Sequence, residues 1–335
     1  MKKMKKYALL LMSVIIILAL AACGSKDESS SSGTKDKNAA TDGKTYKVGI
    51  TQIVEHPSLN EATKGFKAAL KDAGLKVDYQ TKIAQGDQSV NTTAANNLVG
   101  SGVDLIFANS TPSAQAVAAA TTDIPIVFTS VTDAVGAELV KSMEKPGGNV
   151  TGTVDTHPDA IPNTIKFLSE QLSAKKVGMV FNSGEQNSRA QVDGVKKEAK
   201  KAGITIVEAS ASTSAEVKQA TESLVGKVDA IYIITDNTVV SALESVLDVA
   251  NEKKIPVMVG ELDSVKRGGL GAYGFSYYDI GYEAGQKAVE ILKDGKKPAD
   301  IPVAYPANLK LEINKTTADK IGVDIKEDWK AEVVK

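Results

Sequence analysis

The chain contains two similar halves. Four short segments of the first half recur in the second half in the same order, at offsets of 125 to 131 residues. The pairs are KVGI at Lys47 with KVGMV at Lys176, GFKAALKDAGLKV at Gly65 with GVKKEAKKAGITI at Gly194, VDLIFANST at Val103 with VDAIYIITD at Val228, and IPIVFTS at Ile124 with IPVMVGE at Ile255. This period is far too long for a solenoid of stacked short repeats. The duplication therefore predicts two similar lobes.

Each lobe is expected to be an α/β structure. In the first half, short β-branched runs alternate with segments whose apolar residues recur at helical spacing. The expected strands are 46–53, 75–81, 103–108 and 124–130, and the expected helices are 58–74, 87–102 and 112–122. This order favours a parallel sheet with helices on both faces. We therefore predict an α/β fold of two doubly wound parallel-sheet lobes.

The segment 268–322 has no counterpart in the first half and sets the predicted connection between the lobes. We expect the strand and helix of 272–292 to return to lobe one, and a strand at 308–313 to cross back to lobe two. Together with the Pro-Gly-Gly-containing join near residue 150, this gives a hinge with three crossings. The predicted boundaries are 45–154 plus 272–302 for lobe one, and 155–271 plus 303–335 for lobe two.

The N-terminus has the features of a secretory signal. Four lysines (Lys2, Lys3, Lys5 and Lys6) precede an apolar run over 7–22. The following Cys23 is the only cysteine of the chain, and the stretch LAAC resembles the lipobox of bacterial lipoproteins, in which a lipid is attached to the cysteine thiol. We predict a signal peptide over 1–22 and lipidation of Cys23. An uncleaved anchor, or a secreted protein with a chance cysteine, would have similar flanks.

The segment 23–44 is predicted to be a flexible tether. It is rich in Ser, Lys, Asp and Gly and, after Cys23, has no large apolar residue, so it cannot bury enough surface to fold. An unstructured tail without a role would have the same composition. Removal of the signal leaves 36 basic and 41 acidic residues, a net charge of −5. No basic patch of the sequence suggests a nucleic-acid partner, and the mild acidity favours solubility.

Motifs for enzymatic chemistry are missing from the sequence. It has no G-x-S-x-G elbow, no Cys/His spacing for zinc and no G-x-x-x-x-G-K-[ST] phosphate loop. We therefore predict no catalytic residue, no cofactor and no metal site, and a protein that is not an enzyme. The alternative is that His56, next to Glu55, acts as a general base.

Ligands of parallel α/β sheets bind beyond the carboxyl ends of the strands, and two facing lobes can close on a ligand by hinge motion. Ser110 and Thr111 follow a strand and open a helix, where an anion such as a carboxylate is favoured; simple N-capping is the alternative. Asp236 could hold an ammonium group or cap the next helix. Phe275 and Tyr277 could contact an apolar side chain or pack on the sheet. Together these features suit an amino acid.

The sequence resembles the ABC-transporter substrate-binding proteins associated with tryptophan and tyrosine uptake. The resemblance covers 46–322, and its motifs are GITQIVEHPSLNEATKGF, TSVTDAVGAELV, GGNVTGTVD, FNSGEQNS, TDNTV and YYDIGYEAGQKAVEIL. One departure is Asp133 in VTDAV, where many relatives have proline after the aspartate. The ligand-facing positions that the resemblance implies are Gln52, His56, Ser110, Thr111, Thr129, Ser130, Asp155, Asn187, Asp236 and Glu261.

The resemblance implies a type I periplasmic-binding-protein fold and a receptor on the extracellular face of a Gram-positive cell membrane, anchored by lipid on Cys23. Such a receptor delivers its ligand to a membrane permease driven by an ATPase. We expect an amino acid-like ligand, aromatic in character, such as tryptophan, tyrosine or phenylalanine. A nucleoside, a sugar or a peptide remains an alternative. A transcriptional sensor of the same fold is disfavoured by the signal sequence and by the missing helix-turn-helix motif.

Overall fold

The computed structural model describes residues 43–335, which form one compact unit. The predicted signal peptide, Cys23 and all of the predicted tether except Gly43 and Lys44 lie outside the described residues. Within 43–335, no helix combines the length and the apolar character needed to cross a membrane.

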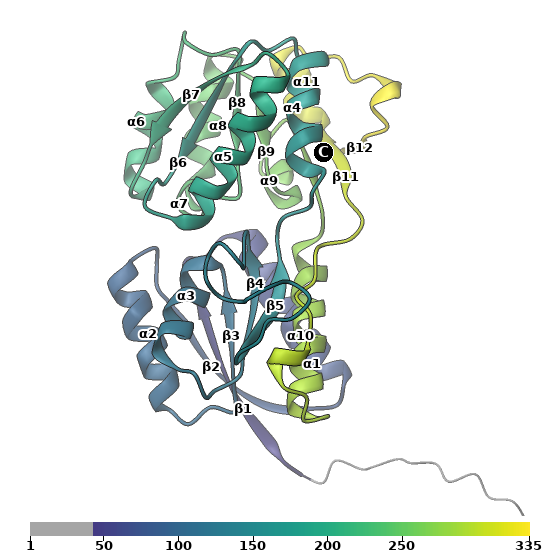
Figure 1. Cartoon of the computed structure of the whole chain (residues 1–335). Coiled ribbons are helices and arrows are strands. Elements are labelled where there is room, and N and C mark those ends of the chain that lie inside the picture. Colours follow the sequence, from purple (N-terminus) through teal and green to yellow (C-terminus); the bar gives the residue numbers. More distant parts are fainter. Residues whose placement is uncertain (1–42) are drawn as a thin grey trace, which may run out of the picture. The chain divides into compact units, whose positions relative to one another are not determined.

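The first lobe is built on a five-stranded parallel sheet with the order β2-β1-β3-β4-β5 (Figure 1). Its strands are β1 (Thr45–Gln52), β2 (Lys76–Ile83), β3 (Leu105–Asn109), β4 (Ile126–Val131) and β5 (Val150–Val154). Its helices are α1 (Pro57–Asp72) and α10 (Tyr277–Leu292) on one face, α2 (Gln88–Gly100) and α3 (Thr111–Ala120) on the other, and a short 3₁₀ turn, η2 (Pro298–Asp300). Apolar clusters fill both faces: stacked Phe66 and Phe107 lie in one, Leu98 and Phe128 in the other.

The second lobe has a seven-stranded sheet with the order β12-β11-β10-β9-β8-β6-β7. Its strands are β6 (Lys176–Phe181), β7 (Thr205–Ser210), β8 (Ala230–Ile233), β9 (Val257–Val259), β10 (Gly271–Gly274), β11 (Lys310–Asn314) and β12 (Glu332–Val334). The helices are α4 (Ala160–Glu170), α5 (Gln186–Lys201) and α11 (Lys315–Ile321) on one side, α6 (Val217–Glu222), α7 (Asn237–Ser241), α8 (Leu243–Glu252) and α9 (Leu262–Lys266) on the other, with 3₁₀ turns η1 (Ser214–Glu216) and η3 (Glu327–Trp329). Only the β10–β11 pair is antiparallel among the described strands. The predicted fold class is confirmed.

The chain passes between the lobes at 155–159, at 275–276 and at 305–309. The second passage differs from the expectation that a strand at Ala272 returns to lobe one. Strand β10 stays in the second sheet, paired with β9 and β11, and Ala272 is fully buried in that lobe's core. Gly271 permits this pairing, because a Cβ there would lie 2.7 Å from the carbonyl oxygen of Glu312. The helix α10 alone therefore returns to lobe one.

Candidate functional site

A small cavity lies between the two lobes. Its lining comes from both lobes and from the hinge: His56, Leu59, Ser130, Thr132, Asp155, Asn187, Thr235, Asn237, Val240, Glu261 and Tyr277. About 260 Å³ is free of atoms, in spaces so narrow that they hold about one water molecule. A larger ligand would therefore need the lobes to part or the lining side chains to move.

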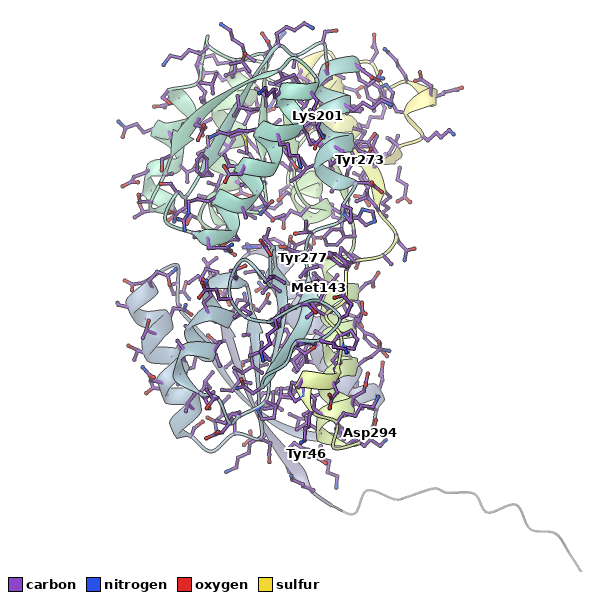
Figure 2. All side chains as sticks on the ribbon, viewed as in Figure 1. Tyr46, Met143, Lys201, Tyr273, Tyr277 and Asp294 are labelled. Atoms are coloured by element: carbon purple, nitrogen blue, oxygen red, sulfur yellow. The ribbon has the colours of Figure 1, made fainter. Side chains whose placement is uncertain are left out.

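Helix starts bring most of the polar side chains to this cavity. His56 is the N-cap of α1, and its Nδ1 accepts a hydrogen bond from the Leu59 amide at 3.5 Å. Asn187 lies in the first turn of α5, and Glu261 is the N-cap of α9. Tyr277, the first residue of α10, lies between the two lobes (Figure 2). Since the amino ends of helices carry free N–H groups and partial positive charge, this arrangement favours anionic groups in the cavity.

Hydrogen bonds connect the lobes around the cavity. The Gln191 side chain in α5 donates to the hydroxyl of Thr132 in lobe one at 3.2 Å, and to the hydroxyl of Thr235 in lobe two at 2.8 Å. The Tyr277 hydroxyl donates to Oδ2 of Asp155 at 2.9 Å, and the Thr132 hydroxyl donates to Oδ1 of Asp155 at 3.2 Å. These contacts fix the orientation of the Asp155 carboxylate.

The two acidic groups of the lining are buried without a cationic side chain among the lining residues. Burial raises the pKa of Asp155 to about 6, against the opposing effect of the hydrogen bonds from Tyr277 and Thr132. Burial also raises the pKa of Glu261 to about 7. A positive charge placed in the cavity would favour the ionised forms of both, so these carboxylates are suited to hold a cation.

His56 is neutral at physiological pH. Burial and, secondarily, the charge of Arg267 lower the pKa of His56 to about 3. Because its Nδ1 accepts a hydrogen bond, the neutral ring carries its proton on Nε2. The imidazole therefore offers one N–H donor and is a poor general base near pH 7.

Two buried polar atoms of the lining have no hydrogen-bond partner: Oγ of Ser130 and Oδ1 of Asn187. Ser130 belongs to the first lobe and Asn187 to the second, and their side chains are 5% and 2% exposed. Buried polar atoms are rarely left without a partner, because desolvation without a hydrogen bond costs about 1–3 kcal/mol. These two atoms are therefore candidate ligand contacts.

Of the ten positions implied by the resemblance, His56, Ser130, Asp155, Asn187 and Glu261 line the cavity. Tyr277, expected either to contact an apolar side chain or to pack on the sheet, lines it too, whereas Phe275 does not and is buried. The other five predicted positions are absent from its lining and are buried nearby: Gln52, Ser110, Thr111, Thr129 and Asp236.

All five have hydrogen-bond partners within their own lobes, including Ser110, whose hydroxyl donates to Ser113 Oγ at 3.4 Å. The Gln52 side chain donates to Val54 and Asn60 and accepts from Thr63 and Asn109. The Thr129 and Thr153 hydroxyls lie 2.8 Å apart. Thr111 Oγ1 accepts from the Thr132 amide at 3.4 Å. Ser110, the N-cap of α3, has a φ of 101° and its side chain makes no capping hydrogen bond.

Asp236 caps a helix, which is the alternative to the predicted role of holding an ammonium group. It is fully buried at the start of α7, where Oδ1 accepts from the Val239 amide at 2.8 Å. Oδ2 accepts from the Asn182 amide at 2.7 Å and from the Ser188 hydroxyl at 2.6 Å. This carboxylate joins three segments of lobe two, and its hydrogen bonds are those of a structural cap.

Replacing Asp236 with alanine is expected to lower the free energy of unfolding by about 3 kcal/mol, because it removes a helix cap and leaves two buried donors without acceptors. Denaturant unfolding measures this change. The control is Asp87→Ala, which removes an exposed cap of α2 bonded to the Ser89 and Val90 amides, with an expected loss of about 1 kcal/mol. Unchanged stability together with lost ligand affinity would return Asp236 to the ammonium role.

The structure also brings Leu59, Thr132, Thr235, Asn237 and Val240 to the cavity, which the sequence did not single out as ligand-facing. Thr132 directly follows β4, and Thr235 and Asn237 lie within four residues of the end of β8. The rule that ligands bind beyond the carboxyl ends of strands therefore could have indicated all three. Leu59 and Val240 lie inside helices, where apolar spacing indicates only a buried face. Within 43–335, no group of three or more His, Cys, Asp or Glu side chains could hold a metal ion.

Known proteins resemble this chain over nearly its full described length. Its sequence is 45% identical over 324 residues to a tyrosine-binding protein of Clostridioides difficile strain R20291, covering 94% of this chain and 92% of that protein. A solved ABC domain from Streptococcus pneumonia in complex with L-Trp is 34% identical, with a TM-score of 0.82 over 87% of this chain and 100% of that chain.

A second solved structure is the ligand-free, open form of a substrate-binding protein with adhesive properties from Clostridium difficile. It is 40% identical, with a TM-score of 0.65 over 87% of this chain and 99% of that chain. The backbone described here is therefore more similar to the tryptophan complex than to the open form. The family described as ABC transporter substrate binding protein matches residues 47–334, and the chain belongs to this family.

Proposed function

We propose that the protein is an extracellular receptor of an ABC importer that binds one aromatic amino acid in the cavity between its lobes. The family implies a small-molecule ligand, together with permease and ATPase partners, and is consistent with an outward-facing location. The observation that carries the choice of ligand is the pair of buried carboxylates, Asp155 and Glu261, in a lining without a cationic side chain. A ligand with an ammonium group would supply the missing positive charge.

The ammonium group would lie between the hinge and lobe two. Glu261 Oε1 accepts from the Ser264 hydroxyl at 2.6 Å, and the Ser58 hydroxyl lies close enough to lower the pKa of this carboxyl group. An ionised carboxylate has about four acceptor sites, so some are left for a ligand. Asp155 retains lone pairs beyond those used by Tyr277 and Thr132, because an ionised carboxylate has about four acceptor sites. The unpartnered Oδ1 of Asn187 adds a neutral acceptor. An ammonium group has three donors and can use all three side chains.

The carboxylate group of the amino acid would take the donors. His56 offers its Nε2–H, and the Ser130 hydroxyl is unpartnered. The amino ends of the 16-residue helices α1 and α10 add favourable partial charge. Leu59, Val240 and the Tyr277 ring supply apolar contacts for the ligand's side chain.

Two observations support an aromatic amino acid over the alternatives. The relatives reported above bind tyrosine and tryptophan according to their names, at 45% and 34% identity. The narrow cavity, enclosed by eleven residues of both lobes and the hinge, favours one small solute over a peptide or an oligosaccharide. The relatives are substrate-binding proteins, and a His56 pKa of about 3 further disfavours an enzyme that uses this histidine as a base.

Thermal unfolding against panels of amino acids, nucleosides and sugars tests this proposal. A ligand at 100 times its dissociation constant adds about 2.7 kcal/mol, which raises the melting temperature by several degrees. We expect a shift with tyrosine, tryptophan or phenylalanine. A shift with a nucleoside or sugar alone would keep the receptor role and overturn the ligand.

We also propose that lipid on Cys23 anchors the receptor. Replacing Cys23 with serine removes the thiol to which the lipid is attached, and the protein is expected to move from the membrane fraction to the medium. Immunoblots of both fractions measure the change. Ser25→Ala, in the same segment, is the control and should stay at the membrane. Continued membrane retention of Cys23→Ser would instead indicate an uncleaved apolar anchor.

A further inference from the structure

Glu185 lies at the edge of the cavity and contacts two of its lining residues. It is the N-cap of α5, is 5% exposed, and borders a separate outer hollow that also includes Asn237. Asn237 faces both spaces, because it lines the inner cavity as well. Glu185 therefore supports two residues that line the inner cavity, Asn187 and Asn237, and is not itself among the lining residues.

The carboxylate of Glu185 holds both asparagine amides. Its Oε2 accepts from Nδ2 of Asn187 at 3.1 Å and from Nδ2 of Asn237 at 2.6 Å. Its Oε1 accepts from the Thr238 hydroxyl at 3.2 Å. An ionised carboxylate only accepts hydrogen bonds, so each asparagine must present its NH₂ group to Glu185 and direct its carbonyl oxygen elsewhere.

This orientation has a visible consequence at Asn187. Its Oδ1 is buried and has no hydrogen-bond partner, although its Nδ2 donates to Glu185. An amide that was free to rotate could exchange its oxygen and nitrogen. The carboxylate prevents this exchange, because an amide oxygen facing it would be repelled.

No cationic side chain of the described residues forms an ion pair with the Glu185 carboxylate. Burial, together with the charge of Asp236, raises the pKa of Glu185 to about 7, and the hydrogen bonds from Asn237, Asn187 and Thr238 oppose this rise. The nearby Arg189 donates to the carbonyl oxygen of Ser183 instead. The hydrogen bonds from Asn187, Asn237 and Thr238 stabilise the ionised form, which predominates above about pH 7 and holds both asparagine amides there.

We propose that Glu185 is a positioning residue for ligand selectivity, which directs the carbonyl oxygens of Asn187 and Asn237 so that the cavity accepts hydrogen bonds from an ammonium group. This inference rests on the proposed function. The inference predicts that Glu185 does not raise the affinity for a ligand that has the carboxylate and the ring of the amino acid but lacks its ammonium group.

Glu185→Gln tests this role. The glutamine keeps the size but is neutral, so the hydrogen bonds from the Asn187 and Asn237 amides lose the charge that strengthens them, and the asparagine oxygens lose the repulsion that directs them away from residue 185. Calorimetry on the full chain in detergent, with L-tyrosine and with 3-(4-hydroxyphenyl)propanoate, measures the selectivity for the ammonium group. We expect the ratio of the two affinities to fall at least tenfold, mainly through loss of L-tyrosine binding.

Matched variants separate positioning from a general structural effect. Glu198→Gln, on the same helix and bonded to Lys201, should leave the ratio unchanged. Adding Asn187→Asp to Glu185→Gln restores an acceptor oxygen whichever way the side chain turns, and should recover part of the ratio. If Glu185→Gln does not fold, Asn187→Ala removes the positioned oxygen directly and should lower the ratio in the same way.

The outcomes also separate this inference from the proposed function. If the wild-type chain binds L-tyrosine and Glu185→Gln keeps the wild-type ratio, the positioning role is overturned and the receptor function stands. If the wild-type chain binds no amino acid, the proposed function fails and the inference fails with it. Equal loss of both ligands by Glu185→Gln would indicate a structural role and would also overturn the inference.

Discussion

Replacing Asp155 with asparagine is expected to weaken binding of an aromatic amino acid about 100-fold, a change of about 2.7 kcal/mol. Asp155 is 9% exposed and lies in the first crossing between the lobes. Its carboxylate is one of the two acidic groups that line the cavity. Removing one partner of a buried charge pair costs 2–5 kcal/mol, because the other charge remains buried. The hydroxyls of Tyr277 and Thr132 can rotate to suit the amide, so the fold should survive.

Isothermal titration at pH 7.5 measures this loss. The control is Asp159→Asn, four residues along the same crossing, whose side chain is 71% exposed and which should bind as the wild type does. Wild-type affinity should also fall as the pH is lowered from 8 to 5. Asp155 and Glu261, with pKa values raised to about 6 and 7, take up protons in this range and lose the charge that attracts the ammonium group. Tight binding by Asp155→Asn would remove this residue from the site.

Replacing Gly281 with alanine is expected to lower the free energy of unfolding by about 3 kcal/mol. Helices α1 and α10 approach closely at glycines, and a Cβ at Gly281 would overlap the backbone carbonyl of Ala62. A Cβ at Gly285 would likewise lie 2.7 Å from the carbonyl oxygen of Phe66. Because backbone atoms cannot rotate away, the two helices must separate, and the packing of lobe one is lost along their length.

Denaturant unfolding compares this variant with Gly194→Ala. Gly194 is also inside a 16-residue helix, α5, but a Cβ there would meet only the Ile161 side chain at an ordinary 3.5 Å. Since alanine favours the helix by about 1 kcal/mol over glycine, Gly194→Ala should be neutral or stabilising. Equal effects of the two substitutions would show that the close approach of α1 and α10 contributes little.

The duplication made the fold predictable. Matched segments at a nearly constant offset imply matched structures, and the strands starting at Thr45 and Lys176 do begin corresponding βαβ units. The segment after Gly268 has no matching segment in the first half, so its structure could not be predicted by comparing the two halves. The sequence therefore could not show that β10 remains in the second sheet, since that depends on its pairing with β11, almost 40 residues later in the chain.

The candidate site was only partly predictable because the residues near strand ends have two roles. His56 and Glu261 face the cavity, whereas Asp236, at an equivalent strand end, caps a helix beneath it. Sequence spacing cannot distinguish these roles, since both use a short polar side chain before a helix. Glu185 illustrates the same difficulty, because its importance comes from its contacts with Asn187 and Asn237, the latter 52 residues away in the sequence.

Calorimetric titration of the wild-type protein with three ligands that share one ring tests whether the cavity recognises a zwitterion: L-tyrosine, tyramine and 3-(4-hydroxyphenyl)propanoate. Paired carboxylates for the ammonium group, with His56 and Ser130 for the carboxylate, predict that L-tyrosine binds at least 100-fold more tightly than either partial ligand. Binding of all three with similar affinity, or of none, would contradict the claim that this cavity recognises a zwitterionic amino acid.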